Sequence, residues 1–348
     1  MKYIRLLLSI VKRTARKLTR GSGKVSTQAD HSLHKARQKT ILSAGQVLSF
    51  EQEKDLVSSK KTRPGFMGIV DIKCKLGEYR FLTLTDDHIA ERLFWFGGFG
   101  YERSSAVVFT HMARKANSVL DLGSYTGYFS ILSYALAKNR NTYAVEANPL
   151  NYHRLCENLR INGANVSACH FALVPSGGSN DTIQIYYDAK LQVLDTGTYA
   201  SHNEADLIPQ KLAKRDSFTV PAISFTGFME KFELEAPHAI GSYDLIKLDV
   251  EGLESSLLRD IIEFYSGSAV VILVEILTKK TYDAIYSMVE AQENFSLAYI
   301  REHDQTIDVH ERSRYARQLG SRNFLIGSTS LIREVANISP HKLLQEYE

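Results

Sequence analysis

The pattern of hydrophobic and polar positions changes character near residue 66. Beyond it, short apolar runs alternate with segments whose apolar residues recur every three or four positions. The runs predict β-strands and the periodic segments predict amphipathic helices. We expect strands at residues 68–73, 79–84, 118–122, 142–146, 166–174, 181–187, 243–250, 269–276 and 323–327, the last as an edge strand. We expect helices at residues 127–138, 150–161, 224–232, 253–264 and 281–291.

Repeated strand–helix units of this length predict a particular fold class. It is an α/β fold with a doubly wound, mostly parallel sheet, an antiparallel edge strand and helices on both faces. Ligands of such folds bind at the rim formed by the carboxyl ends of the strands. We therefore look for the chemistry of this chain where each predicted strand ends.

The charge is spread unevenly along the chain. Residues 1–64 carry fifteen Lys or Arg against four Asp or Glu, a net charge of +11, whereas the whole chain carries +3. Within residues 1–20, apolar and basic positions separate onto opposite sides of a predicted helix. Such a basic amphipathic helix is typical of peripheral contact with an anionic membrane. A helix that is solvated or packed on a partner is the alternative left open here.

Compartment and membrane topology follow from simpler features. The chain has no run of 18 apolar residues, so we expect no membrane-spanning helix. Its three cysteines are scattered and form no CxxC pair, which is typical of reduced thiols in the cytosol. We expect a cytoplasmic protein whose basic arm contacts the inner face of a membrane.

Four predicted strands end in an acidic residue. These residues are Asp121, Glu146, Asp249 and Glu275. Carboxylates are rarely buried without partners, and the rim of the sheet is where ligand sites form. Helix capping is the alternative for any one of them. The four together predict a ligand site.

A glycine loop follows the first of these acidic residues. Gly123 and Gly127 allow a sharp turn and a close approach of the backbone to a ligand. Tyr125 stands where the dinucleotide fingerprint has its middle glycine, which disfavours a pyrophosphate ligand such as NAD. An acidic residue before the loop suits a cationic ligand. The predicted contacts are Asp121, Gly123, Ser124, Tyr125, Thr126 and Gly127.

Glu146 ends the next predicted strand, nineteen residues after Gly127. A carboxylate at this place can accept both hydroxyls of a ribose. S-adenosylmethionine carries an ammonium, a sulfonium and a free ribose diol, so we predict it as the cofactor. Ala147 beside Glu146, and Phe171 or Ala172 at the end of the third strand, are expected to complete its pocket.

Segment 246–254 carries the third set of candidates. Lys247 and Asp249 share one face of a strand by alternation. A lysine inside an apolar strand is costly unless paired, so we expect Lys247 to bind Asp249 or a ligand. Asp249 and Glu251 are candidate general bases, although helix capping is an alternative for Glu251 and more so for Glu254.

Three segments carry a resemblance to a known family. VLDLGSYTGYFS at 119–130, AVEANP at 144–149 and LIKLDVEGLE at 245–254 resemble the FkbM-type methyltransferases. The resemblance implies a class I, Rossmann-like fold and methyl transfer from S-adenosylmethionine to a sugar hydroxyl in a glycan, glycolipid or glycosylated metabolite. It extends from about residue 98 to about 277. It also implies that Glu102, which follows Tyr101 and precedes the strand predicted at 118–122, belongs to the cofactor site.

The expected chemistry is O-methylation. Asp249 or Glu251 would take the proton of the acceptor hydroxyl, and Lys247 would stabilise the developing charge. We assign no metal; a Mg²⁺ ion bridging Asp249 and Glu275 is an alternative, because hard oxygen ligands suit that ion.

Other functions remain open at this stage. One alternative is an RNA or protein methyltransferase that uses the basic arm as a guide, although the acidic body argues against nucleic acid. Another is a non-catalytic binding protein on the same fold. These inferences divide the chain into a basic helix and linker at 1–64, an N-terminal extension packing on the core at 65–115, a methyltransferase domain at 116–330 and a C-terminal tail at 331–348.

Overall fold

The computed structural model describes residues 67–84, 87–177, 181–187, 199–200, 216–237, 241–250, 252–309 and 322–348. The predicted arm and linker at 1–64, most of the insertion at 188–218, and Glu251 lie outside these residues. The described residues form two compact units, one of residues 67–73 and 80–101 and one of the remainder. Each unit is described by itself.

The first unit contains most of two β-strands and a helix, and residues 74–79 between and within the strands belong to the second unit. Strands β1 (Met67–Cys74) and β2 (Gly77–Leu84) pair in a two-stranded sheet, as predicted. Helix α4 (His88–Phe96) begins at Asp87, whose side chain accepts hydrogen bonds from the amides of Ile89 and Ala90. A carboxylate at this position satisfies first-turn amides that have no partner within the helix.

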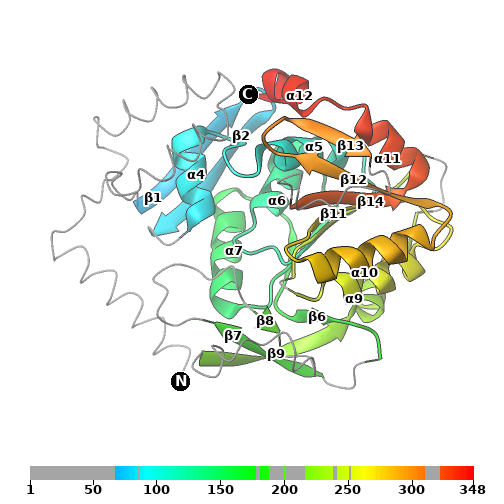
Figure 1. Cartoon of the computed structure of the whole chain (residues 1–348). Coiled ribbons are helices and arrows are strands. Elements are labelled where there is room, and N and C mark those ends of the chain that lie inside the picture. Colours follow the sequence, from blue (N-terminus) through cyan, green and yellow to red (C-terminus); the bar gives the residue numbers. More distant parts are fainter. Residues whose placement is uncertain are drawn as a thin grey trace. The chain divides into compact units, whose positions relative to one another are not determined.

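The second unit is built on a large sheet. In the described residues its strands run in the order β13-β12-β14-β11-β10-β3-β4-β5. Figure 1 labels the first four of them. Their bounds are β3 (Val119–Leu122), β4 (Thr142–Val145), β5 (Ser167–Cys169), β10 (Asp244–Leu248), β11 (Val270–Glu275), β12 (Phe295–Arg301), β13 (Thr306–Val309) and β14 (Asn323–Ser328). Strands β11, β10, β3, β4 and β5 are mutually parallel, and β14, β12 and β13 are antiparallel to their neighbours. The predicted fold class is confirmed.

The position predicted for the last strand is wrong. Strand β14 is not at an edge but lies between β11 and β12, and β13 is the antiparallel edge strand. The residues of β14 are almost all buried, as expected for an interior strand. A Cβ on Gly327 would lie 2.2 Å from the carbonyl oxygen of Val270, so glycine permits the close approach of β14 to β11. The sequence reading did not predict the β12–β13 hairpin that covers the outer side of β14.

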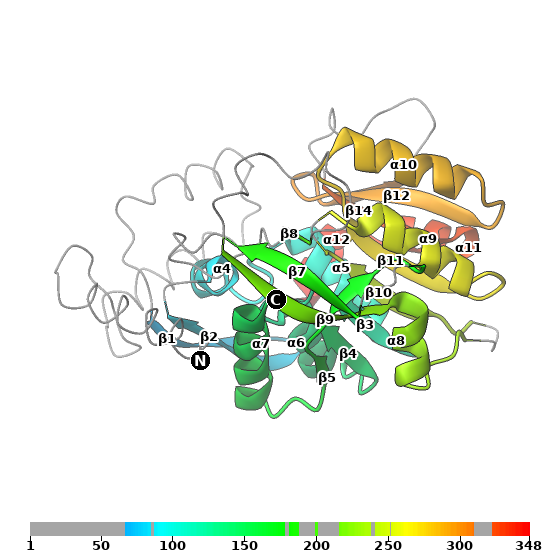
Figure 2. The ribbon, with the colours of Figure 1, turned by 90° about the horizontal axis from the view of Figure 1, so that it is seen from below.

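Helices cover both faces of this sheet. They are α5 (Arg103–Ala113), α6 (Tyr128–Ile131) with a π-helical continuation at Leu132–Ala137, α7 (Pro149–Ile161), α8 (Phe225–Lys231), α9 (Glu254–Phe264), α10 (Lys279–Glu290), α11 (Thr329–Ala336) and α12 (Pro340–Tyr347). Helices α9 and α10 lie side by side (Figure 2). The segment expected as a C-terminal tail contains α12, which packs on α5. None of the described helices is long and apolar enough to span a bilayer.

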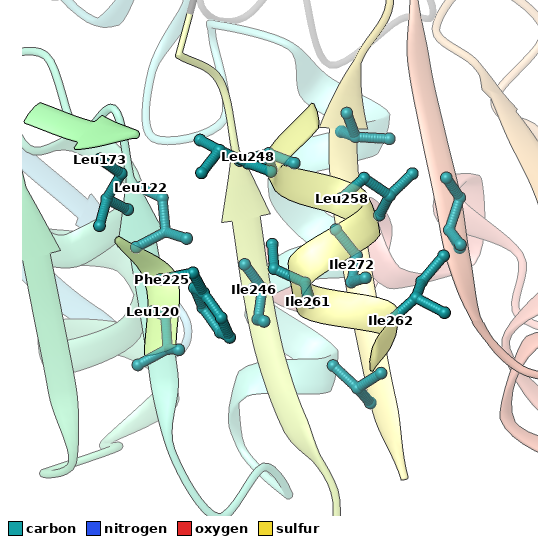
Figure 3. Packing of buried hydrophobic residues seen from close by; sticks show 14 of the residues in the cluster. Leu120, Leu122, Leu173, Phe225, Ile246, Leu248, Leu258, Ile261, Ile262 and Ile272 are labelled. Carbon is teal, nitrogen blue, oxygen red and sulfur yellow. The ribbon is translucent and has the colours of Figure 1, made fainter. Parts of the chain in front are cut away.

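Alternation along the central strands sorts their side chains onto the two faces. Leu120 and Leu122 of β3 and Ile246 and Leu248 of β10 pack in one apolar cluster with residues of α8 and α9, including Phe225 (Figure 3). Burying each such side chain contributes about 1.5–3 kcal/mol. The residues that alternate with these leucines and isoleucines along β3 and β10 therefore point to the opposite face of the sheet. There, Asp121 of β3 and Lys247 of β10 are direct partners in the strand register.

A smaller sheet accounts for the segment between β5 and α8. Its order is β6-β9-β7-β8, with β6 (Ala172–Val174), β7 (Thr182–Tyr187), β8 (Tyr199–Ala200) and β9 (Asp216–Ser224). The single strand predicted at 166–174 is wrong, because the chain leaves the large sheet at His170 and Phe171 and continues as β6 of the smaller sheet. The Phe171 ring lies in the apolar core, 6.1 Å from that of Phe228.

Candidate functional site

The glycine loop between β3 and α6 crosses close to the end of β10. Gly123 and Gly127 have φ angles of 84° and 90°, in the region that favours glycine. A Cβ on Gly123 would lie 1.7 Å from the carbonyl oxygen of Asp249, and one on Gly127 would lie 2.5 Å from Cδ1 of Leu155. Gly123 therefore has no room for a side chain, whereas a side chain at Gly127 would require Leu155 to shift. The loop after β3 and the loop after β10 are therefore packed directly against each other.

Asp121 is hydrogen-bonded to the start of α6, which follows the glycine loop. Its Oδ2 accepts hydrogen bonds from the Ser130 amide at 2.9 Å and from Ser130 Oγ at 2.5 Å. The residue is 1% exposed. Burial raises its pKa to about 6, although the Ser130 bonds and the Lys247 ammonium oppose this shift. Asp121 thus satisfies first-turn donors of a helix, the role that sequence reasoning had set as the alternative to direct ligand contact.

Glu146 holds the middle of the same loop. Its Oε2 accepts a hydrogen bond from the Tyr125 amide at 2.8 Å, and its Oε1 accepts one from the Asn148 amide at 2.7 Å. Tyr125 has a φ of 51°, so this bond helps to hold a backbone conformation that is unfavourable for a residue with a Cβ. Burial raises the pKa of Glu146 to about 7, and the two amides lower it in part. A carboxylate has about four acceptor positions, so Glu146 retains capacity for a ligand.

The remaining predicted cofactor residues differ in their surroundings. Ser124 is buried and donates from Oγ to the carbonyl oxygen of Asp121 at 2.6 Å. Thr126 is fully buried, and its Oγ1 has no hydrogen-bond partner among the described residues. Ala147 is half-buried, and its carbonyl oxygen lies 3.2 Å from Nε2 of His170. Ala172 belongs to the small apolar cluster of the second sheet.

Sequence reasoning missed His170. Its ring stacks on Tyr152 of α7, with centroids 4.9 Å apart and planes at 18°. Its approach to the Ala147 carbonyl also places His170 beside the end of β4. The ring of Phe171, which was predicted to line the pocket, packs in the apolar core instead. The available signal was a polar residue inside the strand predicted at 166–174.

Lys247 and Asp249 form a salt bridge at the end of β10. Lys247 Nζ donates to Asp249 Oδ2 at 3.0 Å, which is the pairing that the strand pattern predicted. The Lys247 side chain is 2% exposed and that of Asp249 is 29% exposed. The ammonium also lies 5.3 Å from the centre of the Phe129 ring, within the range of a cation–π contact.

The charge state of Lys247 follows from its surroundings. Burial alone disfavours the charged ammonium, but the carboxyl groups of Asp249, Glu102 and Glu275 outweigh that cost and raise the pKa of Lys247. Lys247 is therefore a buried, charged group surrounded by acidic residues. A ligand bound here would meet the partly exposed Asp249 carboxylate, with the buried Lys247 ammonium bonded to it.

Glu102 and Glu275 complete this acidic surrounding. Glu102 immediately precedes α5, and its Oε2 is buried with no hydrogen-bond partner in the described part of the chain. Burial raises its pKa to about 8, and Lys247 opposes the shift. Glu275 ends β11 and lies 4.0 Å from the guanidinium of Arg322. Burial raises the pKa of Glu275 to about 7, and Asp249 adds to the rise.

The segment after Asp249 is only partly described. Glu251, a predicted base, lies outside the described residues. Glu254 is the first residue of α9, and its carboxylate accepts hydrogen bonds from the amides of Val250 and Gly252 in the preceding loop. It thus holds the loop after Asp249 instead of capping the first turn of the helix. Within the described residues, no group of three or more His, Cys, Asp or Glu side chains is arranged to hold a metal ion. Asp249, a ligand in the Mg²⁺ alternative, is engaged by the Lys247 ammonium.

Comparison with known families identifies the family of this chain. The family described as the methyltransferase FkbM domain matches residues 119–311, more than half of the chain. The chain belongs to the FkbM methyltransferase family. The match begins at β3 and includes the glycine loop, Glu146, the Lys247–Asp249 pair and Glu275. The protein is an S-adenosylmethionine-dependent methyltransferase of the FkbM kind.

Several solved structures are similar to this FkbM methyltransferase. Methyltransferase FkbM from Methylobacillus flagellatus KT is 13% identical, with 61% of this chain and 44% of that chain covered and a TM-score of 0.35. An O-methyltransferase from Bacillus cereus in complex with SAH is 10% identical, with coverages of 65% and 80% and a TM-score of 0.35. Precorrin-6y C5,15-methyltransferase from Geobacter metallireducens GS-15 is 14% identical, with coverages of 64% and 87% and a TM-score of 0.35. No curated protein matches the sequence.

Proposed function

We propose that this FkbM methyltransferase methylates a hydroxyl group of a sugar-containing acceptor, with S-adenosylmethionine as the methyl donor. The observation that carries the proposal is the buried Lys247 ammonium paired with the partly exposed carboxylate of Asp249, a residue whose backbone carbonyl packs against Gly123 of the glycine loop. This arrangement places a proton acceptor and a fixed positive charge at the rim where ligands of such sheets bind.

The described residues fit a cationic cofactor with a ribose. Glu102 offers a buried carboxylate oxygen that no described residue hydrogen bonds, and Glu146 retains acceptor capacity beside the loop. An ammonium group would satisfy the first and a ribose diol the second. Asp121 fixes the start of α6, and with it the end of the glycine loop, through its hydrogen bond with the Ser130 amide. When bound, S-adenosylmethionine supplies a methyl group that is activated by the adjoining sulfonium.

Asp249 and Lys247 have distinct parts in the proposed chemistry. The Asp249 carboxylate would take the proton of the acceptor hydroxyl, while S-adenosylmethionine, held by Glu102 and Glu146, would supply the methyl group from its sulfur and leave as S-adenosylhomocysteine. A general base of this kind contributes about 10²- to 10⁴-fold to the rate. The Lys247 ammonium stabilises negative charge that develops on the oxygen, because a fixed charge in a buried site needs no reorganisation. Holding the two reactants in line supplies a further part of the barrier reduction.

The surrounding charges support a neutral polyhydroxyl acceptor. Asp249 and Glu275 end neighbouring parallel strands, and each carboxylate interacts electrostatically with the other. Paired carboxylates accept hydrogen bonds from adjacent hydroxyls and repel phosphates and other anions. This favours a sugar in a glycan, glycolipid or glycosylated metabolite over RNA, whose phosphates would meet the same carboxylates.

Transfer of a labelled methyl group tests the proposed acceptor class. We expect purified protein and methyl-labelled S-adenosylmethionine to label a member of a panel of nucleotide sugars, glycolipids and oligosaccharides, with an alkali-stable methyl ether as product. RNA and protein in parallel reactions should stay unlabelled. Label that appears only in RNA or protein would contradict the proposed acceptor, and a protein that binds the cofactor but labels nothing in any pool would favour the non-catalytic alternative.

The location of the protein belongs to the same proposal. The basic arm at residues 1–20 has the pattern of a helix that binds an anionic membrane surface. A cytoplasmic enzyme held at the inner face of a membrane would meet glycolipid acceptors directly. The arm lies outside the described residues, so its sequence alone supports this part.

Cofactor affinity should depend on pH through Glu146. Its pKa of about 7 lies above the usual value for a glutamate, so the ionised form that accepts ribose hydroxyls is lost as pH falls through this value. If only the ionised form binds well, Glu146 alone should lower the affinity about eightfold from about pH 7.5 to about pH 6, and Glu102, with its pKa of about 8, should add to the fall. Calorimetric titration checks this. The variant E146Q should bind weakly with a flatter pH profile; an unchanged profile would contradict the role of Glu146.

A further inference from the structure

The start of helix α5 is capped in an unusual way. Glu102 occupies the cap position with φ 43° and ψ 57°, a left-handed conformation that residues with a Cβ adopt rarely. Among the described residues, its side chain makes no capping hydrogen bond. Short polar side chains at this position, those of Asp, Asn, Ser and Thr, normally accept hydrogen bonds from the first-turn amides, and the longer glutamate side chain does not do so here. In this helix another residue must satisfy the first-turn amides.

Glu302 supplies that cap from 198 residues away in the sequence. It follows β12, and its Oε2 accepts a hydrogen bond from the Ser104 amide at 2.8 Å. Its Oε1 accepts one from the Ser105 amide at 3.0 Å and another from Ser105 Oγ. One carboxylate thus satisfies two amides at the positive end of α5, where a negative charge is stabilising.

The same carboxylate connects α5 to the acidic end of the sheet. Asn323 Nδ2 donates to Glu302 Oε1 at 3.4 Å. Asn323 is the first residue of β14, where it is the register partner of Glu275. Glu302 therefore joins the start of α5 to the strand that pairs with β11, immediately beside the proposed acceptor site.

The consequence of this cap is seen at Glu102. Because Glu302 satisfies the helix, the Glu102 carboxylate is released from capping. It is buried near the Lys247 ammonium and near the carboxyl groups of Glu275, Glu302 and Asp249. Its Oε2 has no hydrogen-bond partner among the described residues. A carboxylate that capped its own helix could not reach toward these groups, since its oxygens would be held at the amides.

We propose that Glu302 is a positioning residue for methyl transfer. It holds the start of α5 so that Glu102 presents its carboxylate to the bound methyl donor, and it acts through Glu102 without touching the ligand. This rests on the proposed function, in which Glu102 binds the cationic part of S-adenosylmethionine.

A double-mutant cycle on cofactor affinity tests the proposal. The variants E302Q, E102Q and the double variant are titrated with S-adenosylmethionine by calorimetry, with folding checked by circular dichroism. Glutamine at 302 loses the charge and one of the two acceptor oxygens, so we expect the Kd to rise about tenfold. In the E102Q background the same change should leave the Kd nearly unaltered, because the group through which Glu302 acts is already removed.

Matched variants separate positioning from general loss of a cap. S224A removes the cap of α8, where Ser224 Oγ accepts from the Gly227 amide at 3.1 Å, and it should leave the Kd unchanged. E302D keeps the charge and should recover part of the affinity. If E302Q does not fold, S105A serves in the cycle, since it removes only the hydroxyl donor to Glu302.

The outcomes are distinct. A Kd that rises in E302Q but not on top of E102Q supports the proposal. An equal rise in both backgrounds, or no rise at all, overturns it and leaves Glu302 as a structural cap, while the proposed function stands. If the unaltered protein binds no S-adenosylmethionine, the proposed function fails, and the positioning role fails with it.

Discussion

Replacing Asp249 with asparagine should lower kcat by about 10²- to 10⁴-fold, the usual contribution of a positioned general base. Asparagine has nearly the same shape and keeps an oxygen that can face Lys247 Nζ, but it cannot take the acceptor proton. Affinity for S-adenosylmethionine should change little, because Asp249 acts on the acceptor side. Initial rates with labelled donor, together with a calorimetric Kd for the cofactor, separate these two effects.

A surface pair of the same composition provides the control. Lys279 and Asp283 form a salt bridge on α10, and both side chains are more than half exposed. D283N removes the same carboxylate from a lysine partner away from the site, and it should leave kcat unchanged. Full activity in D249N would contradict the role of Asp249. Equal loss in D249N and D283N would show that the effect is not specific to the site.

Replacing Gly123 with alanine should destabilise the fold and abolish cofactor binding. Alanine costs about 1–2 kcal/mol in a left-handed conformation, and forcing an atom into packed structure adds about 1–3 kcal/mol. The added Cβ would lie 1.7 Å from the Asp249 carbonyl oxygen, so the loops after β3 and β10 would have to separate. We expect the free energy of unfolding to fall by about 2–5 kcal/mol in urea titrations.

Gly267 is a matched control for the backbone strain. Its φ of 87° is close to the 84° of Gly123, but a Cβ there would meet nothing within 4 Å among the described residues. G267A should therefore lower the free energy of unfolding only by the conformational cost of about 1–2 kcal/mol, and it should leave the cofactor affinity unchanged. If G123A were as stable as G267A, the packing of the glycine loop against the Asp249 loop would not be a constraint.

Much of the site follows from local sequence signals. An apolar run that ends in an acidic residue predicted the strand ends at Asp121, Glu146, Asp249 and Glu275, and the structure places each at or just beyond a strand end. Strict alternation predicted that Lys247 and Asp249 share a face, and they form a salt bridge. These features depend on neighbours two to four residues apart, which a single sequence displays directly.

Other features depend on contacts between distant segments. The cap that Glu302 places on α5 joins residues 198 positions apart, and nothing in the local pattern around residue 302 indicates a helix-capping role. The interior position of β14 likewise results from pairing with β11 and β12, which an apolar run alone does not specify. The division of 166–174 into two strands results from the turn of Phe171 into the core formed with α8.

Calorimetric titration of the unaltered protein with S-adenosylmethionine at about pH 7.5 is the most direct test of the whole account. Two features predict saturable heat at one cofactor per chain: the buried Glu102 side chain, with an oxygen that no described residue hydrogen bonds, and Glu146, which is bonded to the glycine loop. The heat should be weakened by E146Q and absent with NAD. A protein that releases no heat with S-adenosylmethionine, or binds NAD equally well, would contradict it.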